Sequence, residues 1–279
     1  MRPWISWVGS SAPIMREPLV ALVSGGSSGI GLSCAEALAR AGWRVFTLSR
    51  RGGGCQGSTP LSGDVADPAA CEAAVNRVLE EAGRLDLLVN CAGFGISGAA
   101  EFTPMEEARR QLEVNLLGTA NLCSAVLPHF RSRRSGRIIN ISSVAGVTPI
   151  PFQTWYSVSK AGINSYTMAL ANEVRRFGIS VCAVMPGDTR TGFTDARKKS
   201  SEGDEAYGGA ISRSVSRMEK DERGGVSPEK VAEKVLRIAG KRRVAPLYTV
   251  GLVYQLCVLL VHILPASAAN RILYLLYAS

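Results

Sequence analysis

Histidine is scarce in this sequence, which contains only His129 and His262 among its 279 residues. Histidine is the commonest metal ligand and the usual general base of a serine triad. Two isolated histidines therefore argue against both kinds of site, and we expect no metal. We expect His129 on a helix surface and His262 within an apolar C-terminal segment. The chemistry of this chain must come from other side chains.

The sequence also lacks paired cysteines and an apolar N-terminal segment of the kind found in signal peptides. The seven cysteines are scattered, odd in number and free of any C-x-x-C motif. This argues against a disulfide framework or a zinc site and favours the reducing cytoplasm. Residues 1–14 contain one Arg and no sustained apolar core, so they make a poor signal peptide. We expect a disordered extension over 1–14 and a folded unit that begins near Met15.

Acidic residues are outnumbered: 32 Lys and Arg stand against 23 Asp and Glu, for a formal charge of +9. Such a balance can indicate nucleic acid or an anionic surface as the partner. The basic residues gather at 131–134, 197–199 and 241–243, where elements are expected to end, without aromatic interleaving or a nucleic-acid motif. We therefore expect solvated surface and no nucleic-acid partner, although a phosphorylated cofactor would suit this charge.

What the sequence does contain is a regular alternation of short apolar runs and longer helical patterns. The runs suit buried parallel strands, and the β-α-β order predicts an α/β fold, a single doubly wound Rossmann-type sheet with helices on both faces, over 15–250. Ligands of such sheets bind at the carboxyl ends of the strands. The expected strands are 19–24, 44–49, 61–65, 85–89, 137–143, 179–185 and 244–250. The expected helices are 32–41, 68–82, 106–130, 155–176 and 227–239.

A glycine-rich turn lies between the first strand and the first helix. Glycines let the backbone turn sharply and approach a pyrophosphate, whose charge then meets the helix N-terminus. A turn of purely structural purpose is the alternative, but the flanking strand and helix favour cofactor binding. The expected contacts are Gly25, Ser27, Ser28, Gly29, Ile30 and Gly31.

The second strand ends in Ser49-Arg50-Arg51. A carboxylate at this place binds the ribose 2′-hydroxyl of NAD, whereas an arginine suits the 2′-phosphate of NADP. Arg50 therefore predicts NADP(H) in preference to NAD(H), unless both arginines only solvate a loop. A Gly/Ser/Pro-rich loop is expected over 52–60. Asp64 is placed to accept a hydrogen bond from an adenine amino group, and Val65 beside it is also expected at the cofactor.

Tyr156 and Lys160 stand four residues apart in the expected helix 155–176 and so share one face. A phenol alone has a pKa of about 10, too high to exchange protons efficiently near neutral pH. A nearby ammonium favours the phenolate and lowers that pKa. The pair is a plausible proton donor and acceptor, although many surface helices carry such a pair by accident.

These motifs, in this order, closely resemble the short-chain dehydrogenase/reductase family over about residues 18–250. The family's T-G-x-x-x-G-x-G motif stands here as Ser24 to Gly31, with Ser in place of Thr. Its N-N-A-G motif stands as Asn90 to Gly93, with Cys in place of the second Asn. Both substitutions keep small residues. The resemblance assigns the active-site set to Asn115, Ser143, Tyr156 and Lys160, and further cofactor contacts to Asn90, Pro186, Gly187 and Thr191.

The resemblance also implies a mechanism, reversible hydride transfer between a nicotinamide and a carbonyl or alcohol. Tyr156 would protonate the carbonyl oxygen, and Lys160 would lower the Tyr156 pKa and bind the nicotinamide ribose. Ser143 would hydrogen-bond the reacting oxygen. Ser143 is preferred to Ser142 because its spacing of thirteen residues to Tyr156 fits the family. Asn115 would hold a water that leads protons onward from Lys160.

The complete active-site set favours an enzyme over the rival interpretation, a non-catalytic NADP-binding scaffold or sensor that would be free to lose Tyr156 or Lys160. Relatives that look like hydroxysteroid dehydrogenases carry similar apolar C-terminal helices. A lipophilic steroid- or retinoid-like carbonyl therefore ranks ahead of a carrier-bound 3-oxoacyl group. A homo-oligomer is the family expectation. Residues 193–226, rich in Gly, Ser and charge, lie where the family has its substrate lid.

An apolar helical tail is expected over 251–279, after the last strand. About fourteen apolar residues precede Pro265, fewer than the roughly 20 that a spanning helix needs. A second apolar segment, 272–277, follows Arg271. Three interpretations stay open: packing over the pocket or at a subunit contact, peripheral association with the cytoplasmic face of a membrane, or a true span. Basic residues at 241–243 would suit an anionic membrane surface.

Overall fold

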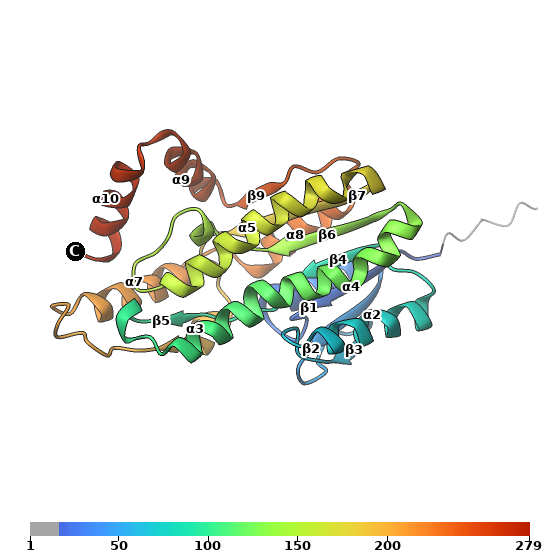
Figure 1. The fold of residues 1–279 in the computed structure, drawn as a ribbon, viewed down its shortest axis with the longest axis horizontal. Coiled ribbons are helices and arrows are strands. Elements are labelled where there is room, and N and C mark those ends of the chain that lie inside the picture. Colours follow the sequence, from blue (N-terminus) through green and yellow to red (C-terminus); the bar gives the residue numbers. More distant parts are fainter. Residues whose placement is uncertain (1–16) are drawn as a thin grey trace, which may run out of the picture.

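The computed structural model describes residues 17–279, so the expectations for 1–14 and Met15 lie outside the described residues. Seven parallel strands form one sheet in the order β3-β2-β1-β4-β6-β7-β9 (Figure 1). The predicted doubly wound α/β fold is confirmed. The strands are β1 Val20–Ser24, β2 Arg44–Ser49, β3 Ser58–Ser62, β4 Leu87–Asn90, β6 Gly136–Ile141, β7 Ile179–Pro186 and β9 Leu247–Val250.

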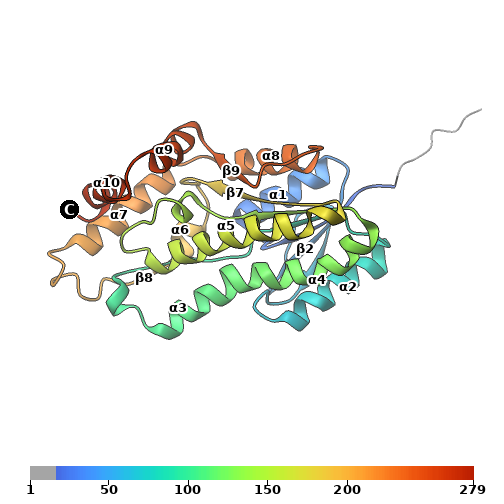
Figure 2. The ribbon, with the colours of Figure 1, turned by 45° about the horizontal axis from the view of Figure 1, so that its top comes forward.

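Helices cover both faces of the sheet because successive strand residues point to opposite faces and both sets are apolar. In β1, Val20 and Leu22 pack under α2, α4 and α5, whereas Ala21 and Val23 pack under α1 and α8 (Figure 2). Each large side chain that is fully buried in these layers contributes roughly 1.5–3 kcal/mol. The helices are α1 Gly29–Arg40, α2 Pro68–Ala82, α4 Gly118–Arg133, α5 Thr154–Val174 and α8 Pro228–Ala239.

The strand order places β1 between β2 and β4, so the chain winds outward in both directions from this point. The carboxyl ends of the central strands lie level, since Ser24 pairs with Asn90 and Asn90 pairs with Asn140. Connections that leave a sheet in opposite directions open a crevice between their first turns. A ligand site is therefore expected where β1 and β4 end.

Part of the predicted loop 52–60 belongs to the sheet instead, because residues 58–62 form the edge strand β3. Pro60 lies within it. Proline lacks an N–H for the ladder and is tolerated in a strand whose outer side has no partner, as here. The predicted strand 61–65 overlaps β3 only at Leu61 and Ser62, because the first three residues of β3, Ser-Thr-Pro, have neither alternation nor an apolar run.

The lid region 193–226 is more regular than its composition predicts. It contains α6 (Phe193–Ala196), the short strand β8 (Lys198–Lys199) and the helix α7 (Ala210–Arg223). Strand β8 pairs in parallel with β5 (Ile96–Ser97) in a separate two-stranded sheet. These elements rise beyond the carboxyl ends of the main strands, on the left of Figure 1. The lid is therefore folded over the predicted ligand site.

The predicted long helix 106–130 is interrupted in its middle. Helix α3 (Met105–Leu112) passes into a π-helical turn, Glu113–Leu117, before α4 begins. Such wide turns are rare and occur often at functional sites. Here the turn carries Asn115, whose side chain is completely buried.

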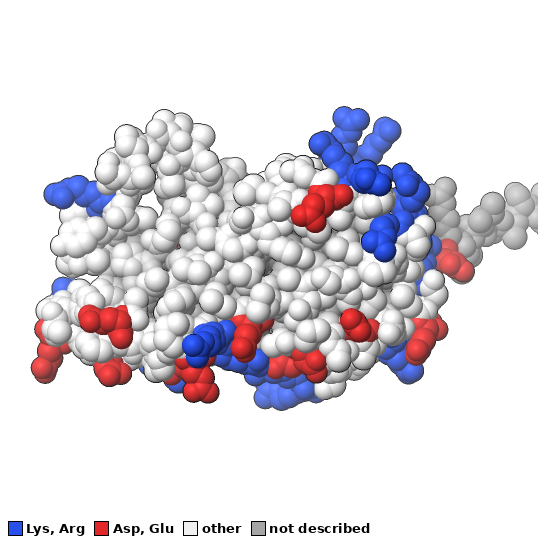
Figure 3. Space-filling view, in the orientation of Figure 1, with Lys and Arg blue, Asp and Glu red and all other residues white. Residues whose placement is uncertain are grey.

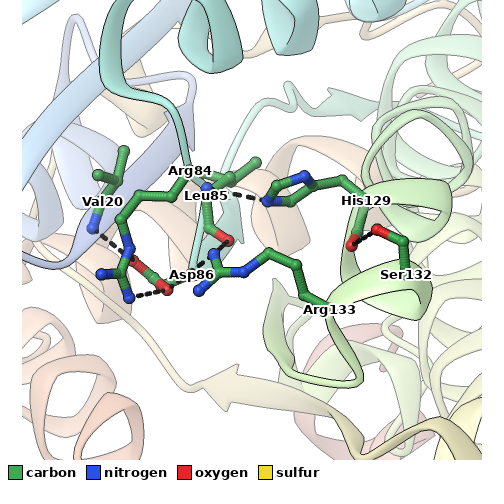
Figure 4. A network of polar contacts seen from close by, with 7 residues as sticks. All are labelled: Val20, Arg84, Leu85, Asp86, His129, Ser132 and Arg133. Atoms are coloured by element: carbon green, nitrogen blue, oxygen red, sulfur yellow. Dashed lines mark hydrogen bonds and ion pairs between the residues drawn. The ribbon is translucent and has the colours of Figure 1, made fainter.

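A network of polar contacts lies at the opposite end of the sheet, where strands β1 and β4 begin (Figure 4). Asp86 accepts a hydrogen bond from the Val20 N–H at 2.9 Å and bonds to two arginines. His129 accepts from the Leu85 N–H through Nε2 at 3.2 Å. Burial and the nearby Arg133 charge lower the pKa of His129, which keeps it a neutral acceptor. His129 is half-buried on α4, which agrees with the predicted position on a helix surface.

Two apolar helices end the chain, as predicted for 251–279. Helices α9 (Leu252–Ile263) and α10 (Ala266–Tyr277) form a hairpin beside α7, beyond the edge of the main sheet (Figures 1 and 2). No side chain of α9 is fully buried. Across residues 17–279, no helix has both the length and the apolar character needed to cross a membrane.

Candidate active site

A cleft of about 650 Å³ lies at the carboxyl ends of the central strands and is covered by the lid. It collects nearly all of the residues singled out in the sequence. Those that line it are Gly25, Ser27, Ser28, Gly29, Ile30, Gly31, Arg50, Asp64, Val65, Ser143, Tyr156, Lys160, Pro186, Gly187 and Thr191. Asn90 and Asn115 are not part of its wall.

The glycine-rich turn forms a cradle that side chains would fill. Gly25 and Gly29 have φ angles of 67° and 53°, which favour glycine. A Cβ on Gly31 would lie 2.2 Å from the Gly25 carbonyl oxygen. The first turn of α1 contains no acidic residue. Its N–H groups and helix dipole therefore suit a diphosphate, and a dinucleotide cofactor fits this turn.

Arg50 and Arg51 are exposed at the rim of the same cleft. Asp64, which also lines the cleft, accepts from the Ala66 N–H at 3.0 Å and forms an ion pair with Arg110 at 2.5 Å. Partial burial works to raise the pKa of Asp64, but these contacts and the Arg50 charge together hold it below its usual range. Asp64 is therefore an ionised acceptor, although Arg110 already occupies one of its oxygens.

Asn90 differs from its predicted role at the cofactor. Its side chain is 3% exposed and donates from Nδ2 to the Asn140 Oδ1 at 2.9 Å. Asn140 in turn donates to the Thr167 hydroxyl at 2.9 Å. The amide therefore points into the core and ties β4 to β6 and α5. Asn90 stabilises the base of the cleft without forming its wall.

Asn115 also lies behind the residues that line the cleft, where it holds the neighbouring loop by hydrogen bonds. Its amide accepts from the Phe94 N–H and donates to the Phe94 carbonyl, both at 3.0 Å, and donates to the Ser159 hydroxyl at 3.1 Å. The loop passes close to both side chains, because a Cβ on Gly93 would lie 3.1 Å from Asn115 Oδ1 and 3.9 Å from Lys160 Nζ. The π-helical turn thus fixes the loop that follows β4.

Helix α5 brings Tyr156 and Lys160 to the cleft together, as their spacing predicts. Lys160 Nζ lies 5.6 Å from the centroid of the Tyr156 ring and donates to the Ile141 carbonyl at 2.9 Å. Burial lowers the pKa of Lys160 to about 8 and raises that of Tyr156 to about 12. The neighbouring Ser143 hydroxyl and Arg197 charge work against the second shift.

These pKa values differ from the expectation that Lys160 lowers the Tyr156 pKa. Both groups are desolvated, and desolvation disfavours the charged form of each. Near pH 7, Lys160 therefore keeps its proton and Tyr156 is a neutral phenol. A neutral phenol can donate a proton, which is what reduction of a carbonyl requires.

Ser142 and Ser143, the two residues that follow β6, make different contacts. The Ser142 hydroxyl donates to the Lys160 carbonyl at 3.0 Å, so it is a structural contact to α5. The Ser143 oxygen accepts from the Ala145 N–H at 3.1 Å, and because Ser143 lines the cleft its O–H can donate there. This geometry fits the preference for Ser143.

Three lid residues near Tyr156 were not found in the sequence. The Arg197 side chain is completely buried and forms an ion pair with Glu222, which lines the cleft. Its guanidinium lies 5.5 Å from the centroid of the Phe193 ring, and that ring lies 5.6 Å from the Tyr156 ring. The prediction of solvated surface over 197–199 was therefore wrong for Arg197. Its partner stands 25 residues away along the chain, so no local pattern could show the pair.

Known proteins resemble both the sequence and the fold. A family model described as short chain dehydrogenase matches residues 19–202. The 3-ketodihydrosphingosine reductase of Bacteroides thetaiotaomicron is 41% identical over 229 residues, 81% of this chain and 85% of that protein. A 3-oxoacyl-[acyl-carrier-protein] reductase of Vibrio cholerae is 36% identical over 188 residues, 64% of this chain and 77% of that protein. The crystal structure of a dehydrogenase from Streptomyces avermitilis superposes with a TM-score of 0.81 at 31% identity, over 92% of this chain and 95% of that one.

Proposed function

Because the chain belongs to the short-chain dehydrogenase/reductase family of NAD(P)-dependent oxidoreductases, we propose that it reduces a lipophilic ketone with NADPH. One observation carries the proposal: a neutral Tyr156 and the Ser143 hydroxyl share the cleft with the glycine cradle of α1. A cofactor diphosphate on the cradle and a carbonyl at Tyr156 would then occupy one continuous space. The scaffold alternative gives no reason for this arrangement.

The residues of the chain have separable tasks in this reaction. When bound, NADPH supplies a hydride to the carbonyl carbon. Tyr156 donates its phenolic proton to the carbonyl oxygen, so that the product is the neutral alcohol. The Ser143 O–H hydrogen-bonds the same oxygen while negative charge develops on it. The Lys160 ammonium, 5.6 Å from the Tyr156 ring centroid, stabilises the phenolate that remains.

The relatives indicate which ketone to test first. The Bacteroides relative is named for 3-ketodihydrosphingosine and the Vibrio relative for a 3-oxoacyl group on acyl-carrier protein. Both names describe a ketone at the third carbon of a chain. We therefore place a long-chain ketone ahead of the steroid- or retinoid-like substrates of a hydroxysteroid dehydrogenase, and keep the carrier-bound 3-oxoacyl group as the alternative.

The exposed arginines at the cleft rim support NADPH rather than NADH. Arg50 forms no ion pair within residues 17–279, so its charge is available to a 2′-phosphate. A charge-assisted hydrogen bond contributes about 1.5–3 kcal/mol, so we expect NADPH to bind about 10- to 100-fold more tightly than NADH. Arg50→Asp should abolish this preference. Fluorescence titrations of both cofactors measure it directly.

The control for this titration is Arg40→Asp, which changes an exposed arginine at the end of α1, outside the cleft. It should leave the NADPH preference unchanged. Reduction is then followed by NADPH absorbance with long-chain ketones. Equal or tighter binding of NADH by the wild-type chain would contradict the cofactor assignment. Binding of NADPH without turnover of any ketone would favour the scaffold.

The terminal hairpin, α9 and α10, is the surface through which we expect the protein to contact a membrane that contains a lipophilic substrate. Large apolar side chains stand exposed on it, and the segment between α8 and β9 carries exposed Lys241, Arg242 and Arg243. Figure 3 shows the hairpin surface at the upper left, largely free of charged side chains, and a group of basic side chains at the upper right. Apolar area beside basic charge suits an anionic bilayer surface. The apolar residues are Leu252, Val253, Leu256, Leu259, Leu260, Ile263, Ile272, Tyr274, Leu275 and Leu276.

We expect the protein to sediment with vesicles that contain phosphatidylserine, and less with phosphatidylcholine alone. Leu256→Asp should weaken sedimentation because Leu256 is 56% exposed on α9, whereas Met105→Asp, at a 52% exposed side chain on α3, should not. The family expectation of a homo-oligomer gives the competing outcome. A dimer in solution that Leu256→Asp dissociates, without any vesicle binding, would assign this face to a second copy of the chain.

A further inference from the structure

Two cysteines lie beside the cofactor end of the cleft, and the proposed mechanism uses neither of them. Cys91 follows β4, at the place where the family motif has its second Asn, and it lines the cleft. Its side chain is partly exposed. Cys34 lies on the second turn of α1 and is completely buried. The exchange of Asn for Cys therefore brings a nucleophilic side chain to the cofactor cleft.

The packing of α1 against the loop that follows β4 brings these two thiols together. A Cβ on Gly31 would lie 3.2 Å from the Cys91 Cβ, so Cys91 faces the first turn of α1. Cys34 stands three residues after Gly31 and therefore shares that face of the helix. Both cysteine side chains pack in the same apolar cluster, and their thiols are in hydrogen-bond contact. A small movement is enough to join the two sulfurs in a disulfide.

The surroundings of the two thiols give them different tasks in an oxidation. Contact with the Cys91 thiol and burial raise the pKa of Cys34, so Cys34 stays protonated and out of reach of solvent. Cys91 is open to the cleft and lies within electrostatic reach of Lys160. Burial lowers the pKa of Lys160, and the attraction to a Cys91 thiolate works against that shift. The Lys160 ammonium can therefore stabilise Cys91 as the attacking thiolate.

The backbone around this pair is already closely packed. The Ser24 hydroxyl oxygen accepts from the Cys91 N–H at 3.1 Å, and a Cβ on Gly25 would lie 2.8 Å from the Ala92 nitrogen. A disulfide draws its sulfurs to about 2 Å, shorter than any hydrogen bond. Pulling Cys91 towards α1 must therefore move the glycine cradle or the loop that follows β4. Both line the cleft, so we expect a disulfide to weaken the binding of a dinucleotide.

We propose that Cys34 and Cys91 form a reversible disulfide when hydrogen peroxide enters the empty cleft, and that this disulfide disables cofactor binding. The Cys91 sulfur attacks the O–O bond of the peroxide and becomes a sulfenic acid, and one water leaves. The Cys34 sulfur then attacks the Cys91 sulfur, so that an S–S bond forms and the second water leaves. The two thiols lose two electrons and two protons, and the peroxide is reduced to two waters. Exchange with a dithiol restores both thiols.

The test treats the full chain with hydrogen peroxide, removes the peroxide and follows two quantities. Alkylation of the remaining thiols after unfolding, with peptide mapping by mass spectrometry, should find Cys34 joined to Cys91. Fluorescence titration should show NADPH affinity lower by at least about tenfold, as for one lost charge-assisted hydrogen bond to the diphosphate. Dithiothreitol should restore the affinity. NADP⁺ present during the treatment should prevent the disulfide, because it covers the cleft that Cys91 lines.

The matched control is Cys257→Ser, which removes an exposed thiol on α9 outside the cleft and should keep the wild-type response to peroxide. In Cys34→Ala, dimedone should trap a sulfenic acid at Cys91 and no disulfide should form there. Wild-type chain that keeps both thiols after treatment would overturn this inference, as would an equal, dithiothreitol-reversible loss of affinity in Cys91→Ser.

The inference rests on the cofactor site of the proposed function and does not depend on ketone reduction. A reduced wild-type chain that binds neither NADPH nor NADH would overturn the proposed function. The peptide map would still decide separately whether the disulfide between Cys34 and Cys91 forms.

Discussion

Replacing Tyr156 with Phe is expected to lower kcat by about 10²- to 10⁴-fold, the usual contribution of a positioned proton donor. The variant keeps the ring, which packs at 5.6 Å from Phe193, and removes only the hydroxyl. Ketone reduction would then lack the proton that neutralises the oxygen. Lys160 and Ser143 would still carry their contacts to the main chain, so NADPH affinity should change little.

The measurement is NADPH oxidation under saturating ketone, with cofactor titration in parallel. Tyr166→Phe is the matched control, since Tyr166 lies on the same helix α5 but outside the cleft. It should retain turnover. Wild-type kcat in Tyr156→Phe would contradict the assignment of the proton donor. A parallel loss of NADPH binding would instead show that the hydroxyl acts in cofactor binding.

Gly31→Ala is expected to disable the phosphate cradle. The new Cβ would meet the Gly25 carbonyl oxygen at 2.2 Å, and no side chain can rotate to relieve a contact with backbone. The turn and α1 must separate, at a cost of about 1–3 kcal/mol in the free energy of unfolding for overpacking of this kind. A distorted turn no longer aims its N–H groups at one point. NADPH affinity should fall by at least about tenfold, equivalent to about 1.4 kcal/mol.

Thermal unfolding and NADPH titration measure the two effects separately. Gly240→Ala is the control, because its Cβ would meet nothing closer than 3.9 Å and it follows α8 outside the cleft. It should leave NADPH affinity unchanged. A Gly31→Ala chain that binds NADPH normally would show that the cofactor does not rest on this turn.

Local patterns predicted the parts of this molecule that local physics determines. The apolar run before Gly25 and the Ala-rich stretch after Gly31 identified a strand and a helix, because burial on both faces and helical packing leave a periodic trace. The spacing of Tyr156 and Lys160 placed both on one face of α5, as the structure shows. The family resemblance added Ser143, which the structure places in the same cleft.

Long-range contacts account for what the sequence left hidden. Asn90 was expected at the cofactor, but its amide binds Asn140, 50 residues away. In the sequence Arg197 is part of a basic run, whereas in the structure it forms an ion pair with Glu222. The raised pKa of Tyr156 is also caused chiefly by its burial rather than by its neighbour four residues along. None of these effects leaves a periodic or adjacent signal.

The terminal hairpin is tied to the cleft by a hydrogen bond from the Tyr254 hydroxyl to Asp188, and this has a practical consequence for handling the protein. Tyr254 belongs to α9, the exposed apolar helix that a worker would delete or mask to improve expression. A chain shortened at Gly251 would lose the phenol that holds Asp188, together with the ring that packs on Gly187. Enzyme truncated in this way would report the selectivity of a different pocket, so substrate screens need the intact C-terminus.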